Sequence, residues 1–276
     1  MLSNRLVYYP YMKITDIQKR FRQVDLKKYP QLQGLTRNQI YQGEMGPGGL
    51  ILASEMSRRI PLQKNMRVMD LGCGKGATSI FLARTYSATV YAIDLWISAS
   101  EIFTAVRKAD CEDKVVPFNL DTTKELPFAD EYFDVIFCMD AWHYFGANPG
   151  FLAQISKYLK PGGYLVIGNP CFDREFQNPP PKAYEAFWTN EFSKYHSPKW
   201  WKELVQKSGI FPEVTAEEMQ DGIVLWEDLL LHDIEIGNMR KGILEADADE
   251  IVFGQDNPDY PHLTHYILTA RKLKTA

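Results

Sequence analysis

Residues 66–76 read MRVMDLGCGKG: an apolar run that ends in aspartate and leucine, followed by glycines at positions 72, 74 and 76. The residues after them, ATSIFLARTY (77–86), have the composition of a helix. A strand, a glycine-rich turn and a helix form the ligand-binding corner of doubly wound α/β folds, because glycine lets the backbone approach a ligand closely. The turn alone leaves three ligands open: a dinucleotide, a mononucleotide, or a compound without phosphate groups.

Short apolar runs alternate with amphipathic stretches from residue 64 to residue 168. Their near-continuous apolar character is typical of strands covered on both faces. Helical patterns at 96–110 and 151–160 lie between them, and Pro161 and two glycines stop the second. This spacing predicts βαβ units and a doubly wound, mostly parallel α/β sheet. The four runs after the first are TVYAID (89–94), KVVPFNL (114–120), FDVIFCM (133–139) and GYLVIG (163–168).

Further segments flank this core on both sides. Two helices are expected ahead of the first strand, at 14–28 and 48–60, as covers over a site. After residue 168 the chain is rich in aromatic residues and prolines, and Ser197 then fits the N-cap of a helix. The rest is expected to hold a strand at 211–219, an acidic helical stretch at 221–252 and an alternating strand at 263–272.

The composition describes an ordinary globular protein and excludes some partners. The 276 residues carry a net charge of −4 without a basic tract, which argues against a nucleic-acid partner. The cysteines are scattered without a C-x-x-C pair, which predicts reduced, buried thiols and no metal site. The first residues lack the apolar core of a signal peptide, and no apolar run approaches about 18 residues. We therefore expect a soluble cytoplasmic protein with no membrane partner.

The spacing of the glycines and the acidic residues around them narrows the ligand. A dinucleotide loop reads G-x-G-x-x-G, but here Gly76 comes one residue early and Asp70 precedes the loop, where its charge would repel a phosphate. The P-loop pattern G-x-x-x-x-G-K-[ST] is absent. Asp94 ends the second strand, where it can accept hydrogen bonds from ribose hydroxyls. Asp121 follows the third strand, where it could accept a hydrogen bond from the exocyclic amine of a bound base. Together they describe an adenosine pocket without phosphates.

Four ordered motifs resemble those of class I S-adenosylmethionine-dependent methyltransferases, in the small-molecule branch of the type 11 and ubiquinone-biosynthesis kind. The motifs are VMDLGCGKG (68–76), AIDL (92–95), LDTTKELPFADEYFDVIFCMDAWHYF (120–145) and ISKYLKPGGYLVIG (155–168). The resemblance implies a seven-stranded sheet with an antiparallel last strand. It also implies one domain over 1–276, divided into a helical lid (1–63), a cofactor-binding core (64–168) and a segment that completes the sheet and caps the acceptor side (169–276).

The resemblance also implies roles for individual residues around the cofactor. The methionine portion would lie against Asp70 and the backbone of Gly72, Cys73, Gly74 and Gly76. Asp94 would bind the ribose, with Leu95 and Trp96 along the adenine and Asp121 and Thr122 at its edge. Cys138 or Met139 would lie under the sulfonium. YQGEMGPGGLILASEM (41–56) further resembles the phosphoethanolamine, sarcosine and cyclopropane-fatty-acid branches, which places Tyr41, Gly48 and Gly49 near the methionine end.

Three residues after the fourth strand are candidates for a general base: Asp140, His143 and Tyr144. Histidine titrates near neutral pH and could accept the proton of the nucleophile. In the phosphoethanolamine enzymes an aspartate and a histidine of this segment lie four residues apart. Here Asp140 and His143 are three apart, which puts phosphoethanolamine in doubt as the substrate.

The sequence thus predicts an S-adenosylmethionine-dependent methyltransferase that acts on the nitrogen or oxygen of a small-molecule acceptor by in-line transfer. Two alternatives stay open, a non-catalytic S-adenosylmethionine-binding module and a nicotinamide-dependent oxidoreductase. Asp70 argues against the oxidoreductase, because it precedes the loop that would hold phosphates. A homodimer is also left open, and the identity of the acceptor is not readable from the sequence.

Overall fold

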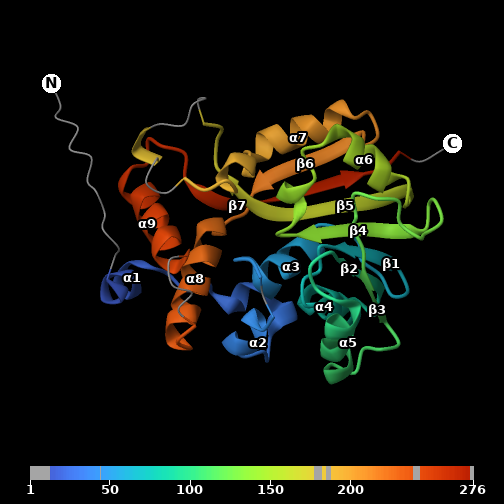
Figure 1. Cartoon of the computed structure of the whole chain (residues 1–276), viewed down its shortest axis with the longest axis horizontal. Coiled ribbons are helices and arrows are strands. Elements are labelled where there is room, and N and C mark those ends of the chain that lie inside the picture. Colours follow the sequence, from blue (N-terminus) through green and yellow to red (C-terminus); the bar gives the residue numbers. More distant parts are fainter. Residues whose placement is uncertain (1–12, 44, 177–181, 185–187, 239–242, 274–276) are drawn as a thin grey trace.

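The computed structural model describes residues 13–43, 45–176, 182–184, 188–238 and 243–273. The first twelve residues, on which the signal-peptide prediction rests, lie outside these ranges. Its centre is a seven-stranded sheet in the order β3-β2-β1-β4-β5-β7-β6 (Figure 1). Only β7 runs antiparallel to its neighbours, so the predicted fold class is confirmed. The strands are β1 (Arg67–Leu71), β2 (Thr89–Asp94), β3 (Val115–Asn119), β4 (Phe133–Met139), β5 (Leu159–Phe172), β6 (Glu213–Glu218) and β7 (Leu263–Arg271).

The direction in which the chain adds strands changes between β1 and β4. The chain adds β2 and β3 on one side of β1, then crosses to the other side to form β4 and β5. Leu71 pairs with Ile93, and Asp94 pairs with Asn119, so the carboxyl ends of the first three strands lie level. Open α/β sheets bind ligands in the crevice at such a switch point.

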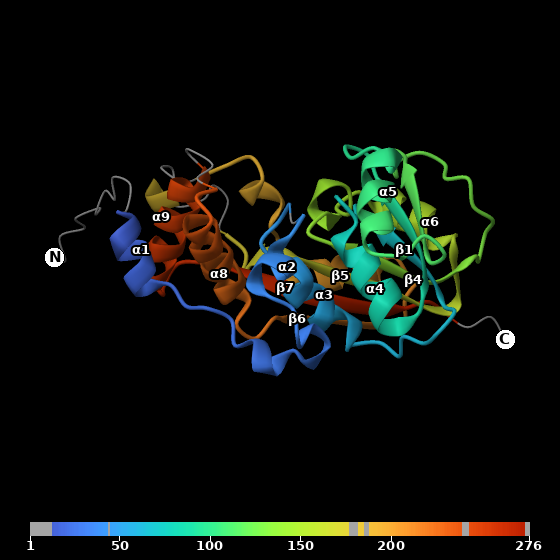
Figure 2. The same cartoon turned by 90° about the horizontal axis from the view of Figure 1, so that it is seen from below.

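Helices cover both faces of the sheet (Figures 1 and 2). One face carries α3 (Gly49–Ser57), α4 (Ala77–Tyr86) and α5 (Ala99–Lys108), and the other carries α6 (Pro149–Ser156) and α7 (Pro198–Lys207). Alternate residues of each strand serve the two apolar cores: Val68 packs in the first and Met69 in the second. The N-cap predicted for α7 is confirmed, because the Ser197 side chain accepts a hydrogen bond from the Trp200 amide.

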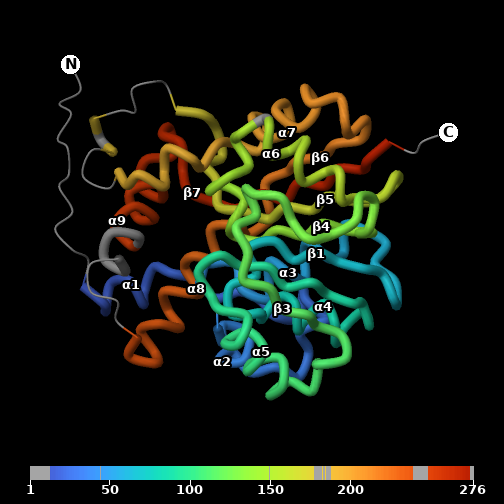
Figure 3. Tube along the Cα trace, turned by 45° about the vertical axis from the view of Figure 1, so that its right-hand side comes forward, coloured from blue at the N-terminus to red at the C-terminus, as the bar shows by residue number. Residues whose placement is uncertain are grey.

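A third group of helices gathers beyond the carboxyl end of β5 (Figures 1 and 3): α1 (Ile14–Arg20), α8 (Gly222–Glu235) and α9 (Ile243–Asp256). Next to it lies α2 (Arg37–Tyr41). Ion pairs tie the N-terminal segment to α8, Arg22 to Glu227 and Arg37 to Asp228. Short 3₁₀ helices span Leu26–Lys28, Pro30–Leu32, Trp142–Tyr144, Lys182–Tyr184 and Phe192–Lys194. None of the helices within the described ranges is long and apolar enough to cross a membrane.

Two predicted helices are wrong in their extent. The helix expected at 14–28 ends at Arg20, because Phe21 is extended and buried and Asp25 starts a separate turn by accepting a hydrogen bond from the Lys27 amide. The helix expected at 151–160 ends at Ser156. Its last residues belong to β5, and an irregular pairing between β4 and β5 accommodates Pro161 and the glycines after it.

Candidate active site

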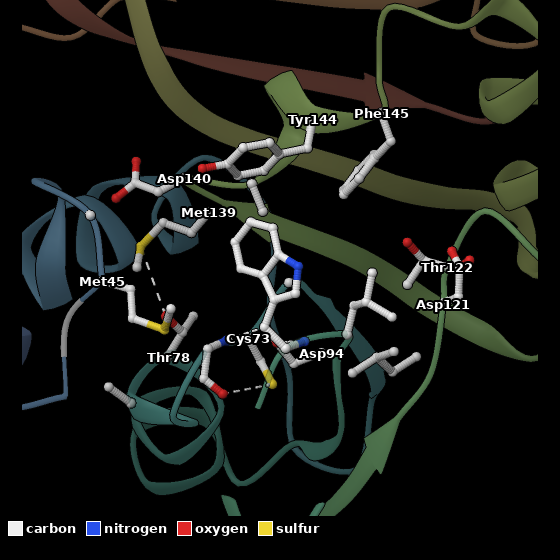
Figure 4. Close-up of a pocket in the computed structure, with 18 of the residues that line it drawn as sticks. Met45, Cys73, Thr78, Asp94, Asp121, Thr122, Met139, Asp140, Tyr144 and Phe145 are labelled. Carbon is white, nitrogen blue, oxygen red and sulfur yellow. Dashed lines mark hydrogen bonds between the residues drawn. The ribbon is translucent and has the colours of Figure 1, made fainter. Parts of the chain in front are cut away.

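A cavity of about 260 Å³ opens at the carboxyl ends of β1, β2 and β4 (Figure 4). Five segments line it: the loop after α2, the glycine loop after β1, the turn after β2, the turn after β3, and the segment after β4. Asp121 and Thr122 lie on one side of it, and Met45, Met139 and Asp140 lie on the opposite side. The cavity therefore sits where the strand order predicts a ligand.

The glycine loop is pinned to β2 through its backbone. The amides of Gly72 and Cys73 donate to the Ile93 carbonyl at 2.9 and 3.1 Å. Gly72 has a φ of 74°, and a Cβ atom there would collide with the side chain of Ala141, so this position requires glycine. Gly72, Cys73 and Gly74 line the cavity, whereas Gly76 caps the start of α4 outside it.

Asp94 joins the glycine loop to the turn after β2. Its Oδ2 accepts a hydrogen bond from the Gly74 amide at 2.8 Å, and its Oδ1 accepts from the amides of Trp96 and Ile97 at 2.8 and 2.9 Å. The carboxylate lines the cavity. Since each carboxylate oxygen has two lone pairs, Oδ2 keeps one for a ligand hydroxyl.

The predicted adenine side forms the rim of the cavity. Leu95 and Trp96 line it and are 55% and 64% exposed, large values for apolar side chains. The Trp96 ring meets the Tyr144 ring edge-on at 5.1 Å between centroids. Asp121 accepts hydrogen bonds from the amide and hydroxyl of Thr123 at 2.9 and 2.6 Å, and these bonds lower its pKa. Thr122 is buried beside it.

Several predicted cofactor residues lie outside the lining. Asp70 is buried beneath the glycine loop, where it accepts a hydrogen bond from the Ser79 hydroxyl at 2.6 Å. Burial raises the pKa of Asp70 to about 7. Cys138 is buried in β4, and burial raises the pKa of its thiol. These two side chains support the floor of the cavity, whereas Met139 lines it.

Tyr41, Gly48 and Gly49, which the resemblance places near the methionine end of the cofactor, also lie outside the lining of the cavity. Tyr41 donates its hydroxyl proton to Asp228 on α8, and its ring packs against His232 at 5.0 Å between centroids. Gly48 does not line the cavity, but its amide donates to Asp140 Oδ2 at 3.1 Å, and Gly49 begins α3. These residues therefore anchor the loop between them.

The three candidate bases occupy different positions. Asp140 lines the cavity, and burial raises its pKa to about 7. Tyr144 lies at the rim and donates to Glu191 at 3.1 Å, and its pKa is raised, chiefly by burial. His143 is buried outside the lining, with Nδ1 3.1 Å from Asn169 Oδ1, and burial lowers its pKa. The geometry thus favours Asp140 over His143 for contact with an acceptor.

Sequence reasoning missed the loop after α2 as part of the lining. Gly43, Met45 and Gly46 line the cavity directly. A Cβ atom on Gly46 would lie 2.6 Å from Asp140 Oδ2, so glycine permits the close approach. The glycines of GEMGPGG (43–49) carry this signal, but the resemblance assigns a role only to the last two, Gly48 and Gly49. Other lining residues missed are Ala77, Thr78, Ile93, Thr123, Ala141 and Phe145.

The charge of the lining tests which ligand fits. It contains three carboxylates, Asp94, Asp121 and Asp140, and no lysine, arginine or histidine among its described residues. A phosphate would find no cation there, whereas a sulfonium or ammonium group would be stabilised by the carboxylates. The residues therefore fit S-adenosylmethionine better than a dinucleotide. Within the described ranges, no cluster of three or more histidine, cysteine or acidic side chains could hold a metal.

Comparison with known proteins agrees with this arrangement. A family model described as "Methyltransferase domain" matches residues 62–222. Phosphoethanolamine N-methyltransferase 1 of Triticum aestivum is 28% identical over 222 residues, which cover 77% of this chain and 42% of that protein. Its counterpart from Arabidopsis thaliana is 29% identical over 225 residues, 77% of this chain and 43% of that protein. The chain thus matches less than half the length of these curated relatives.

Solved structures share the fold. Phosphoethanolamine N-methyltransferase 2 of Haemonchus contortus, in complex with phosphomonomethylethanolamine and S-adenosylhomocysteine, has a TM-score of 0.65 at 20% identity, covering 86% of this chain and 56% of that chain. The [4+2]-cyclase SpnF has a TM-score of 0.61 at 19% identity, covering 82% and 81%. Because the family model covers more than half of the sequence, this chain belongs to the methyltransferase domain family, and the family predicted from the motifs is confirmed.

Proposed function

We propose that this chain is an S-adenosylmethionine-dependent methyltransferase that methylates a small molecule at nitrogen or oxygen. The observation that carries the proposal is the cavity at the switch point, with three carboxylates and no basic side chain in its described lining. S-adenosylmethionine supplies an activated methyl group on a sulfonium. The protein then has to hold the acceptor in line and keep water out.

Each half of the cavity has its own task in this proposal. Asp94 binds the ribose hydroxyls while it holds the Gly74 amide, and Leu95 and Trp96 cover the adenine. Asp121 and Thr122 meet the adenine edge. Met139 lies against the methionine end, and residues 1–63 act as the lid through Met45 and Gly46.

Asp140 is the proposed general base. It lines the cavity after β4, and its pKa of about 7 lets it take a proton near neutral pH. A carboxylate at this place suits an acceptor that arrives protonated, so we favour an amine over a hydroxyl compound. Phosphoethanolamine, the acceptor named for the wheat relative, is not favoured, because the lining offers its phosphate no cation.

A second candidate is a protein that binds S-adenosylmethionine without methylating. The observation behind it is the cyclase that shares this fold. Both candidates share a small-molecule partner. We further propose a cytoplasmic location and no nucleic-acid partner, and a homodimer stays open.

A methyl-transfer screen separates the two candidates. The full chain is incubated with S-adenosylmethionine labelled in the methyl group and with panels of small amines, phenols and carboxylic acids. We expect label in an amine product, and a rate of labelling at least about 100-fold lower when the chain carries Asp140→Asn. Cofactor binding without label in any panel would reject the methyltransferase and leave the binding module.

A further inference from the structure

His265 on β7 reaches the acceptor side of the cavity from a distant part of the chain. The side chain is fully buried, and its Nδ1 lies 2.9 Å from the Gly222 carbonyl at the start of α8. A carbonyl only accepts hydrogen bonds, so Nδ1 carries the proton and Nε2 is left as an acceptor in the neutral ring. Nε2 lies 3.8 Å from Asp140 Oδ1.

The two facing atoms are both buried and both lack a hydrogen-bond partner in the structure. An ionised Asp140 and a neutral His265 would place two acceptors against each other without a donor, which is costly away from water. A small rotation of the Asp140 carboxyl group that brings Oδ1 from 3.8 Å to hydrogen-bond distance of Nε2, with one proton between them, satisfies both atoms. The geometry therefore describes a pair that takes up a single proton, with Asp140 on the cavity wall and His265 behind it.

We propose that His265 is a positioning residue for the general base: Asp140 takes the proton that the acceptor loses, and His265 Nε2 shares that proton and orients the carboxyl group. The proposal rests on the methyltransferase function proposed above. Methylation of an ammonium acceptor releases one proton: an N–H bond of the acceptor breaks, and an O–H bond forms on Asp140. The pair passes from one negative charge to neutral and returns the proton to water after product release.

The titratable groups around Asp140 and His265 do not compete with the pair for this proton. Burial raises the pKa of Asp140 to about 7 and lowers the pKa of His265 to about 4, so the proton resides on the carboxyl group and is donated to the ring. On α8, which packs on β7, Glu227 and Asp228 are held in ion pairs with arginines. Burial moves the pKa of the other neighbouring groups so that they stay neutral near pH 7: Cys138, His143, Tyr144, Cys171 and Tyr266.

Two substitutions of His265 separate positioning from packing. His265→Asn keeps an amide near Nδ1, able to donate to Gly222, and lacks the atom that faces Asp140. His265→Gln places an amide near Nε2, where it donates to the ionised carboxylate instead of accepting from the neutral acid. We expect His265→Gln to shift the inflection of the kcat–pH profile down by about one unit. We expect His265→Asn to lower kcat about tenfold, with S-adenosylmethionine affinity within about twofold of wild type in both. Unchanged pH profiles for both variants would overturn the proposal.

A second measurement needs neither acceptor nor cofactor. The ring Cε1–H signal of His265, identified by its loss in His265→Gln, is followed by NMR between about pH 5 and about pH 9. We expect a step near pH 7 in wild type, where Asp140 titrates, and no such step in Asp140→Asn, because the amide does not titrate. A signal that is identical in the two proteins would reject the pair even if methyl transfer is found. A coupled step without methyl transfer would retain the pair and reject the proposed function.

Discussion

The two halves of the cavity are held together in different ways. On the cofactor side, Asp94 bonds to three backbone amides from the two loops beside it, all within 20 residues along the chain. On the acceptor side, Asp140 bonds to Gly48, 92 residues away, and its other oxygen faces His265 without a partner. The cofactor side is held by residues close to it in sequence. The acceptor side depends on segments from the N-terminal and C-terminal parts of the chain.

This difference separates the side of the cavity suited to binding the cofactor from the side suited to proton transfer. Polar groups that the backbone already satisfies are fixed before a ligand arrives, which suits recognition of one invariant cofactor. Buried polar atoms without partners carry an energetic cost, and their environment shifts their pKa values. The acceptor half therefore has the groups whose protonation can change during a reaction.

The largest effect is expected from Asp140→Asn, which tests the acceptor half. The amide keeps the size of the side chain and cannot take a proton, so kcat should fall about 100- to 1000-fold. S-adenosylmethionine affinity measured by calorimetry should stay within about threefold. The exposed Asp130→Asn is the matched control. A comparable loss of cofactor affinity would show that the halves are not separate.

Asp94→Ala tests the cofactor half in the same way. Three amides lose their acceptor, and the proposed ribose contact is lost as well. S-adenosylmethionine should bind about 100-fold more weakly, equivalent to about 2.7 kcal/mol. Asp121→Ala is the comparison inside the same half. Among the described residues the Asp121 carboxylate accepts hydrogen bonds from Thr123 of its own turn, so its loss should weaken cofactor binding less than Asp94→Ala does. Equal binding by Asp94→Ala and wild type in calorimetry would contradict the ribose assignment.

Asp70→Asn tests whether the buried carboxyl group of Asp70, beneath the glycine loop, changes its protonation near neutral pH. Its pKa of about 7 lies above the usual value near 3.9, so the folded state binds this proton more tightly than the unfolded chain. This contribution to stability is complete below about pH 4 and is lost as the pH rises through about 7. Between about pH 5 and about pH 8, wild type should lose on the order of 2 kcal/mol more unfolding free energy than Asp70→Asn. Denaturant unfolding at both pH values checks this, with the exposed Asp113→Asn as control; parallel curves for Asp70→Asn and wild type would refute it.

The smallest effect is expected from Tyr41→Phe, which tests whether the N-terminal lid serves the cofactor half. Asp228 loses the phenol donor but keeps Arg37, so stability should fall by about 1 kcal/mol. S-adenosylmethionine affinity should fall about threefold, because the loop after Tyr41 lines the cavity. Tyr132→Phe removes a comparable bond, to Tyr91, away from the cavity, and should leave affinity unchanged. If both variants bind equally well, the lid does not depend on Tyr41.

The same contrast explains what the sequence could predict. The bounds of β2 and β4 agree with the predicted strands, and the ordered motifs identified the family and most of the cofactor-side lining. These features follow from short-range patterns. The extension of β5 across Pro161 depends on an irregular pairing with β4.

The acceptor side could be predicted only in part. Asp140, His143 and Tyr144 come from one short segment, but the backbone turn decides which side chain meets the cavity, and the sequence does not give that direction. His265 carried no signal, because only the pairing of β7 with β5 brings it opposite Asp140. Met45 and Gly46 were missed for a similar reason, since the fold places their loop over the cavity.

The cavity is proposed to bind a cationic adenosyl ligand without phosphates. Calorimetric titration of the full chain with S-adenosylmethionine, and separately with ATP and NAD, tests it most directly. We predict one S-adenosylmethionine per chain with a Kd on the order of micromolar, near −8 kcal/mol, and no measurable heat from ATP or NAD. Tighter binding of either phosphate-bearing nucleotide, or no binding of S-adenosylmethionine, would contradict the account.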